Sequence, residues 1–290
     1  MKCLVSTDTS CLINYEVLKK YDISVFALNV IVDGQEYLDG ITIDQPTLRD
    51  AMRSGKNIKT STPPLGEIIE YFENLFSKGY DRIIHFTISS KLSSMYDLFC
   101  NVANNNFPGK LFVVDSYALS SVMLSQVFLA YDEINKGTSC EDVIKLLEER
   151  KLDNVVLFIP ENLTALKNGG RISPAIALIG NMLGIKPVIS LKDGQLEKEG
   201  TTKHVKRTIL DGVQEFKEKY PVSDYDYTVV EFDAKPEVMD YLYNSINEIL
   251  VEEGFVKGIV PINVCAHCGP GTIGVAVSKK INGKSIKDFL

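Results

Sequence analysis

The chain has 290 residues, of which 45% are hydrophobic, and a formal net charge of −7; these values allow two compact domains and exclude a wholly disordered protein. Acidic residues outnumber basic ones by 38 to 31, and no basic run could neutralise a phosphate backbone, so nucleic acid is excluded as a partner. No apolar segment approaches the roughly 18 residues that would span a bilayer, and the N-terminal residues do not form a signal peptide. We therefore predict a cytoplasmic protein without a transmembrane segment, for which a transient contact with a membrane surface stays open.

Short β-branched segments alternate with helical patterns in the first half of the chain, which indicates βαβ units. The expected strands are residues 3–6, 25–32, 82–88 and 111–115. Apolar residues three and four apart predict an amphipathic helix after Pro63 and Pro64, with Pro64 in its first turn. Asp33-Gly34 predicts a two-residue hairpin turn, because both central residues of such a turn need positive φ. These elements make up a first α/β domain, residues 1–152, with a mainly parallel sheet and a projecting hairpin region.

The alternation restarts after about residue 152 and predicts a second α/β domain, residues 153–290. A short polar helix reaches Lys167, Gly169-Gly170 breaks the pattern, and Asp193-Gly194 predicts a turn. The expected strands are residues 155–159, 187–191, 227–232, 259–264 and 275–277, and the expected helices are residues 203–219 and 236–252. The predicted fold class is therefore α/β, with two α/β domains.

Neither the cysteines nor the glycines predict a bound metal or cofactor. The six cysteines are scattered along the chain, which is typical of reduced, buried thiols. Cys265 and Cys268 form a lone C-x-x-C without the second ligand pair that structural zinc requires. Gly269, Gly271 and Gly274 match the dinucleotide pattern G-x-G-x-x-G, but a strand is expected after them where that fingerprint needs a helix.

Polar side chains gather at turns where a ligand could be bound. Thr60, Ser61 and Thr62 precede the amphipathic helix, and Ser93 and Ser94 follow the expected strand 82–88. The carboxyl ends of strands are where open α/β sheets bind ligands. Helix capping is the alternative role for these hydroxyls.

Two further positions could contribute to the same kind of site. Gly170 and Arg171 lie on a turn at the expected domain junction, where a surface salt bridge is the alternative for the arginine. His267 is expected between a strand end and a glycine-rich turn, with a structural histidine as the alternative. A run that is apolar nearly all round follows Arg171, so it is either an ordinary core helix or the lining of an apolar cavity; its members are Ile176, Ile179, Met182 and Leu183.

In order and spacing, these segments resemble the DegV family of bacterial fatty-acid-binding proteins over essentially the whole chain. Residues 5–10 resemble the family's Asp-Ser-Thr motif, and Thr60-Ser61 the start of its Thr-Ser-Gln-Pro motif. Leu92-Ser93 resembles its Leu-Ser-Gly-Thr-Tyr loop, residues 169–173 its Gly-Gly-Arg-Ile-Ser turn, and residues 267–274 its His-x-Gly-x-Gly segment. Thr62 stands where the family usually has Gln, and Ser94-Met95 where it usually has Gly-Thr.

The resemblance implies a carrier without its own catalytic centre. A long-chain fatty acid would lie in an apolar tunnel lined by Ile176, Ile179, Met182 and Leu183. Its carboxylate would be held at the domain interface by Thr60, Ser61, Ser93 and His267, with Thr62, Ser94, Gly170 and Arg171 near the head group. The resemblance further implies a separate fatty acid kinase as partner, which makes an acyl phosphate for phospholipid synthesis.

The alternative reading of these residues is an acyl hydrolase. Ser93 would be the nucleophile and His267 the base, because a serine at a strand-to-helix turn and a histidine late in the chain follow hydrolase order. The nucleophile-elbow sequence is missing, since Lys91 and Met95 occupy the positions that glycine takes in that motif.

Overall fold

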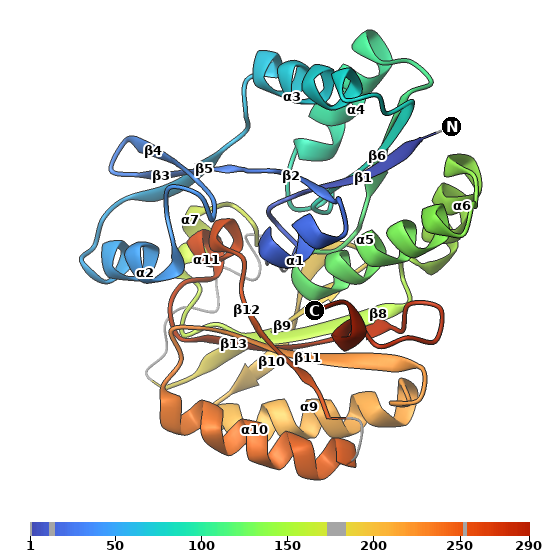
Figure 1. Cartoon of the computed structure of the whole chain (residues 1–290). Helices are drawn as coiled ribbons and strands as arrows, with labels where there is room; N and C mark the ends of the chain where they lie inside the picture. The colour runs from blue at the N-terminus through green and yellow to red at the C-terminus, as the bar shows by residue number, and fades with distance from the viewer. Residues whose placement is uncertain (1, 12–14, 173–183, 252–253) are drawn as a thin grey trace.

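The computed structural model describes residues 2–11, 15–172, 184–251 and 254–290. Its first half contains a four-stranded, all-parallel sheet with the order β2-β1-β6-β7 (Figure 1). The strands are β1 (Cys3–Asp8), β2 (Ser24–Phe26), β6 (Arg82–Thr87) and β7 (Leu111–Asp115). The helices around it are α1 (Tyr15–Lys20), α3 (Leu65–Ser77), α4 (Met95–Asn106), α5 (Ser120–Asn135) and α6 (Cys140–Arg150). The predicted parallel sheet is thus confirmed.

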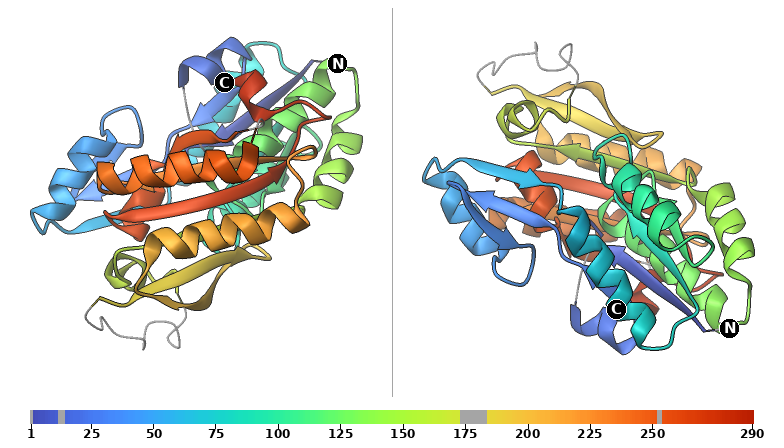
Figure 2. Two further views of the ribbon diagram at one scale, coloured as in Figure 1. Left: turned by 90° about the horizontal axis from the view of Figure 1, so that it is seen from below. Right: turned by 90° about the horizontal axis from the view of Figure 1, so that it is seen from above.

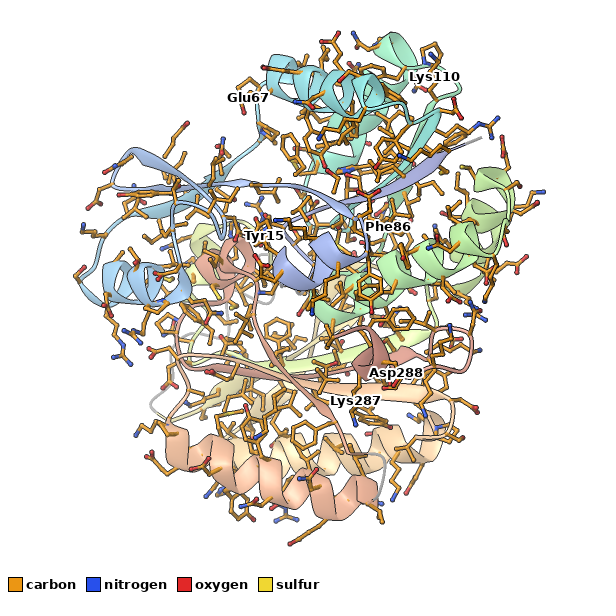
Figure 3. All side chains as sticks on the ribbon, viewed as in Figure 1. Tyr15, Glu67, Phe86, Lys110, Lys287 and Asp288 are labelled. Carbon is orange, nitrogen blue, oxygen red and sulfur yellow. The ribbon has the colours of Figure 1, made fainter. Side chains whose placement is uncertain are left out.

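Helices cover both faces of this sheet, which is why its central strands β1 and β6 are buried along nearly their whole length. The apolar stripe of α3 packs with α4 on one face, as the sequence pattern predicted, although Pro64 is the N-cap of α3 and lies just before its first turn. In Figure 3, Phe86 of β6 lies in the interior, whereas Glu67 on α3 and Lys110 before β7 lie at the surface.

A small antiparallel sheet and α2 (Gln45–Arg53) project from the first half. Its strands, in the order β4-β3-β5, are β3 (Asn29–Val32), β4 (Gln35–Leu38) and β5 (Ile58–Ser61). The predicted hairpin is confirmed: Val32 pairs with Gln35, and Asp33 and Gly34 have φ of 51° and 86°. The single strand predicted over residues 25–32 is wrong, because the chain leaves the parallel sheet after Phe26 and enters the small sheet at Asn29.

The second half forms a six-stranded mixed sheet in the order β10-β9-β8-β13-β11-β12, in which only β11 and β12 are parallel. Its strands are β8 (Asn154–Ile159), β9 (Lys186–Lys192), β10 (Gln195–Thr202), β11 (Tyr225–Phe232), β12 (Val256–Ile259) and β13 (Thr272–Lys279). The helical segments are α7 (Thr164–Asn168), α9 (Val205–Lys219), α10 (Pro236–Leu250), α11 (Ile262–Cys268) and the short 3₁₀ helix η2 (Ile286–Phe289). The turn at Asp193-Gly194 and the strand after the glycine motif are as predicted.

One predicted element of the second half is wrong. Residues 259–264 were expected to form a strand, but β12 ends at Ile259 and α11 begins at Ile262. The alternating β-branched residues favour a strand locally, whereas Pro261, with φ of −54°, is suited to the position just before a helix. His267 therefore lies in the last turn of α11 and not between a strand end and a turn.

The α5 helix joins the two halves. It packs against β1 of the parallel sheet and against β13 of the six-stranded sheet (Figure 1). The opposite face of the six-stranded sheet is covered by α9 and α10, which run side by side (Figure 2).

We propose a domain boundary at residue 152, because α6 ends at Arg150 and the first strand of the second sheet begins at Asn154.

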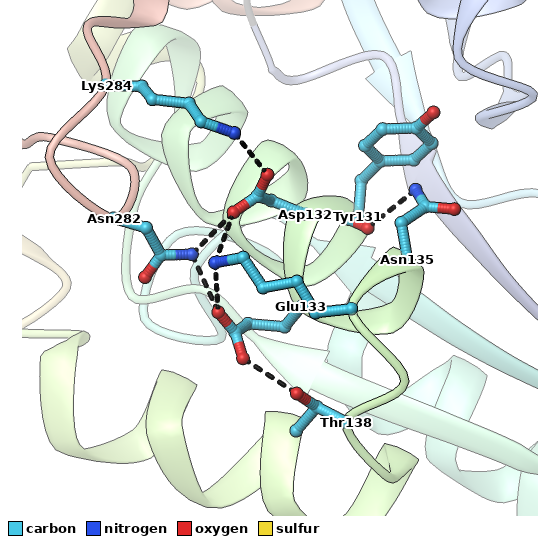
Figure 4. Close-up of polar contacts among 8 residues, drawn as sticks. Tyr131, Asp132, Glu133, Asn135, Thr138, Asn282 and Lys284 are labelled. Atoms are coloured by element: carbon cyan, nitrogen blue, oxygen red, sulfur yellow. Dashed lines mark hydrogen bonds and ion pairs between the residues drawn. The ribbon is translucent and has the colours of Figure 1, made fainter.

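The C-terminal residues return to α5 and are held there by charged groups. Lys284 Nζ lies 2.9 Å from Asp132 Oδ1, and Asn282 Nδ2 lies 2.7 Å from Asp132 Oδ2 (Figure 4). Lys136, one turn along α5, also pairs with Asp132 at 2.7 Å. Desolvation would raise the pKa of Asp132, but the hydrogen bonds from Lys136, Lys284 and Asn282 outweigh it and lower the pKa.

Replacing Asp132 should therefore loosen the attachment of the C-terminal segment. We expect Asp132→Asn to lower the free energy of unfolding by about 1 kcal/mol at neutral pH. A carboxylate whose folded pKa is lowered stabilises the fold above its unfolded pKa of about 4 and loses this effect as the pH falls. Denaturant unfolding at several pH values should thus show the two proteins converging below about pH 4. Asp211→Asn, at an exposed i,i+4 ion pair on α9, is the control and should change stability far less.

Candidate ligand-binding site

A cavity of about 210 Å³ lies between the two halves of the chain. Most of its lining is apolar and comes from both halves, including Leu28, Leu92, Val156, Phe158, Leu191 and Val264. The polar lining residues lie at the carboxyl ends of β1, β6 and β7, on β5 and on α11; among them are Ser10, Thr60, Ser93, Ser120, Asn263 and His267. An apolar cavity with a few convergent polar groups is the usual form of a small-molecule site.

Thr60 and His267 meet at this cavity. Thr60 Oγ1 lies 2.9 Å from His267 Nε2, although the two residues are 207 positions apart in the sequence. Thr60 is on strand β5 and does not cap α3, which has no side-chain cap. Burial, together with the nearby positive charge of Arg171, lowers the pKa of His267 to about 4. The imidazole is therefore neutral at pH 7 and acts as a hydrogen-bonding group, not as a cation.

The glycine turn after α7 holds the ring of His267 in place. A Cβ atom on Gly169 would lie only 2.2 Å from His267 Nδ1, so the close approach of this ring requires glycine. The backbone of Gly169 itself is ordinary, with φ of −75°. Gly170 has φ of 70° and donates its N–H to the carbonyl of Lys167, closing the end of α7; it is not among the described residues that line the cavity.

Arg171 bridges the two halves beside the same cavity. Its Nε donates to the backbone carbonyl of Leu92 at 3.1 Å, and its Nη1 donates to the carbonyl of Gly169. The guanidinium is half-buried and bonds to backbone carbonyls, and within the described residues it does not form the surface salt bridge that was the alternative for it. Its positive charge thus lies next to the neutral imidazole of His267.

Ser93 also lines the cavity, at the loop between β6 and α4. Its Oγ accepts from the backbone N–H of Met95 at 3.3 Å, which leaves the hydroxyl hydrogen available to a ligand. Nε2 of His267 faces Thr60, and no hydrogen bond joins Ser93 to His267 among the described residues. The nucleophile–base contact that the hydrolase alternative requires is therefore not formed here.

The remaining residues predicted for the site fall into two groups. Ser61, Thr62 and Ser94 line the cavity with Thr60 and Ser93. The predicted tunnel residues Ile176, Ile179, Met182 and Leu183 lie outside the described residues, so their role stays a prediction.

Among the described residues no group of three or more metal-ligating side chains occurs, and no described helix is long and apolar enough to cross a membrane.

The sequence did not predict a polar junction in the wall of the cavity, where Ser10 and Asn263 are lining residues. Asp39, at the end of the small sheet, accepts the backbone N–H of Asn263 at 3.0 Å, and Asn263 Nδ2 donates to Ser10 Oγ at 2.6 Å. Burial raises the pKa of Asp39 to about 7 and that of Asp8 to about 6. Asn263 precedes His267 by one helical turn, a spacing that would have indicated a shared face had α11 been recognised as a helix.

The parallel sheet and the mixed six-stranded sheet enclose a mostly apolar cavity with a few polar lining residues. This arrangement defines a two-domain α/β protein with a site for a largely apolar ligand. The family model described as "Uncharacterised protein, DegV family" matches residues 2–280, and the chain belongs to this family. A DegV domain-containing protein of Staphylococcus aureus is 28% identical over 96% of this chain and 99% of its own length.

Solved structures of DegV proteins have the same fold. A structure described as fatty acid binding of a DegV family protein from Thermus thermophilus matches with a TM-score of 0.85 and 25% identity, over 96% of this chain and 100% of that one. DegV from Bacillus subtilis, described as a fatty acid binding protein, matches with a TM-score of 0.82 and 25% identity, over 97% of this chain and 100% of that one. The predicted family and fold class are therefore confirmed.

The contact between Gly169 and His267 can be tested without a ligand. We expect Gly169→Ala to displace the imidazole from its buried position, so that the pKa of His267 rises from about 4 toward the ordinary value of about 6.5. NMR titration can follow it, because the chain has only three histidines. Gly200→Ala is the control, since nothing lies within 4 Å of a Cβ added there. An unchanged titration in the Gly169 variant would contradict the proposed close contact.

Proposed function

We propose that this protein is a carrier that binds one long-chain fatty acid, with the acyl tail in the apolar cavity and the carboxylate at Thr60, Ser93 and His267. The observation that carries the proposal is the convergence of Thr60 and His267, 2.9 Å apart, in the lining of a mostly apolar cavity. The relatives from Thermus thermophilus and Bacillus subtilis, both described as binding fatty acids, support the ligand class.

Burial of the tail would supply most of the affinity. About 14 methylenes at roughly 0.8 kcal/mol each gain on the order of 11 kcal/mol on leaving water. Association costs an estimated 4 to 15 kcal/mol, so the tail alone gives poorly defined binding and the polar groups must fix the orientation. Because each hydrogen bond to a charged group contributes about 1.5–3 kcal/mol, two or three of them would offset the desolvation of the carboxylate.

The polar groups are arranged to donate to an anion. In the tautomer with the proton on Nε2, His267 donates to Thr60 Oγ1, which leaves the Thr60 hydroxyl hydrogen free for the carboxylate. Ser93, whose oxygen already accepts from Met95 N–H, can donate in the same way. Arg171 adds a positive charge while its hydrogen bonds to Leu92 and Gly169 hold it in place. Ser61, Thr62 and Ser94 would lie around the head group.

Retention of the ligand through purification tests the carrier. We expect native mass spectrometry of the protein from bacterial cells to show the polypeptide plus one long-chain fatty acid. Thr60→Val replaces the hydroxyl with a methyl group of similar size and should lower the affinity for a fatty acid about tenfold or more. Thr201→Val, an exposed threonine on β10, is the matched control. A bare polypeptide mass under gentle conditions would count against the carrier.

We further propose that the bound acid is presented in the cytoplasm to a separate fatty acid kinase, which transfers the γ-phosphoryl group of ATP to a carboxylate oxygen and releases ADP. The carboxylate would be the accessible end of the ligand, since Thr60, Ser93 and His267 are partly exposed. The motif departures at Thr62 and Ser94-Met95 also line the cavity, so the kinase partnership has to be tested separately from fatty acid binding.

The kinase partnership predicts acyl phosphate only when the loaded carrier, kinase and ATP are all present. Trapping with hydroxylamine would report the acyl phosphate as an acyl hydroxamate. A kinase that yields this product with its own carrier and none with this protein would contradict the partnership while leaving fatty acid binding intact.

A further inference from the structure

The cavity contains a second polar group away from Thr60, formed by Ser10, Ser120 and Asn263. All three line the cavity and are at most 6% exposed. They come from three distant parts of the chain: the loop after β1, the start of α5, and α11. A polar group enclosed by apolar walls is costly unless its hydrogen bonds are made.

Two atoms of this group have no hydrogen-bond partner within the described part of the chain. They are Ser120 Oγ and Asn263 Oδ1. Asn263 Nδ2 donates to Ser10 Oγ at 2.6 Å, so Oδ1 is the atom of this amide that Ser10 does not engage. Within the described residues Asn263 Oδ1 is therefore a buried acceptor without a donor, and Ser120 is a buried hydroxyl that can donate or accept.

Ser120 is also held in an unusual backbone conformation. Its φ is 53°, in the left-handed region that non-glycine residues rarely adopt. Its backbone N–H donates to the carbonyl of Ser10 at 2.7 Å, which fixes this conformation. Strained residues of this kind are concentrated at ligand and active sites. The backbone conformation of Ser120 costs free energy, and a serine with a purely structural role would not require it.

The hydrogen-bonding capacity of the two unpaired atoms determines which ligand group they can bind. The Asn263 oxygen requires a ligand group that donates, and a hydroxyl can donate to it while also accepting from or donating to Ser120. An ionised carboxylate offers only acceptors, and so does a ketone. The head group therefore belongs at Thr60 and His267, and the second polar group takes a different part of the ligand.

We propose that Ser120 and Asn263 bind a hydroxyl substituent on the acyl chain, so that this protein accepts hydroxylated long-chain fatty acids. The inference rests on the proposed function and specifies its substrate class. Asn263 precedes His267 by four residues on α11, about 6 Å along the helix axis. The hydroxyl would thus lie near the carboxyl end of the chain and not near the methyl end.

The test compares acids of one chain length by displacement of a fluorescent fatty acid from the delipidated full-length protein. The probes are the unsubstituted acid, an acid hydroxylated near the carboxyl group, and one hydroxylated near the methyl end. In the wild-type protein we expect the first two to bind comparably and the third to bind about tenfold or more weakly, because its hydroxyl is buried without partners. The readout is the ratio of affinities for the hydroxylated and unsubstituted acids.

Ser120→Ala should lower this ratio by about three- to tenfold for the acid hydroxylated near the carboxyl group. Ser121→Ala is the matched control, because Ser121 is a neighbouring buried serine whose hydroxyl also lacks a partner in the described residues but does not line the cavity. Its ratio should stay at the wild-type value. Should the alanine variant fold poorly, Ser120→Gly removes the same hydroxyl and is compatible with positive φ.

Two outcomes would overturn the inference. If the wild-type protein disfavours both hydroxylated acids equally and Ser120→Ala changes neither ratio, the polar group holds a water molecule only, and fatty acid binding stands. If no acid displaces the probe, the proposed function fails and this inference fails with it. A lowered ratio in Ser120→Ala with an unchanged ratio in Ser121→Ala would establish the hydroxyl site.

Discussion

The hydrogen bond between Thr60 and His267 is the contact on which the site depends. It joins a strand of the small sheet to a helix of the second half across 207 positions of sequence, so it forms only when the two halves are packed together. Gly169 limits the position of the imidazole, and Arg171 ties the turn behind it to the loop after β6. Each group that would bind a carboxylate is thereby positioned by a different part of the fold.

Buried polar groups specify how the halves meet. Asp39, Asn263 and Ser10 form a chain of hydrogen bonds from the small sheet through α11 to the loop after β1. Removing the polar group at one of these positions would leave its partner buried and unpaired, which costs more than the hydrogen bond contributes. Apolar packing along α5 gives the contact its stability, and this polar chain fixes its register.

Much of the fold could be predicted from local pattern. The hairpin at Asp33-Gly34, the turn at Asp193-Gly194 and the amphipathic stripe of α3 are short-range signals that tertiary packing did not alter. The strand expected over residues 259–264 is wrong, because its β-branched residues favour a strand while Pro261 and packing against the small sheet favour α11. Residues 25–32 were predicted as one strand, because no turn residue in the local sequence marks Leu28 as the link between two sheets.

The candidate site could be predicted in part. Thr60, Ser93, Arg171 and His267 were named from motifs, and the structure brings all four to one cavity. Gly169 was assigned to a turn motif but to no role in the site, because its contact with His267 depends on a residue about 100 positions away. Nothing in the sequence marked Ser120 or Asn263 as a ligand-binding residue. Ser120 begins a helix, and Asn263 lay in a strand that was predicted wrongly. Only the folded structure shows that both line the same cavity.

The placement of α5 limits how a ligand could enter. Twelve of its sixteen residues are buried, because one side of the helix faces the parallel sheet and the other faces β13. Hinging the halves apart would strip apolar surface from this helix, at about 25 cal/mol for each Å² exposed. A ligand should instead enter and leave through small displacements of the loops that line the cavity. The rate of ligand exchange would then depend on local loop motion, while the two halves stay packed together.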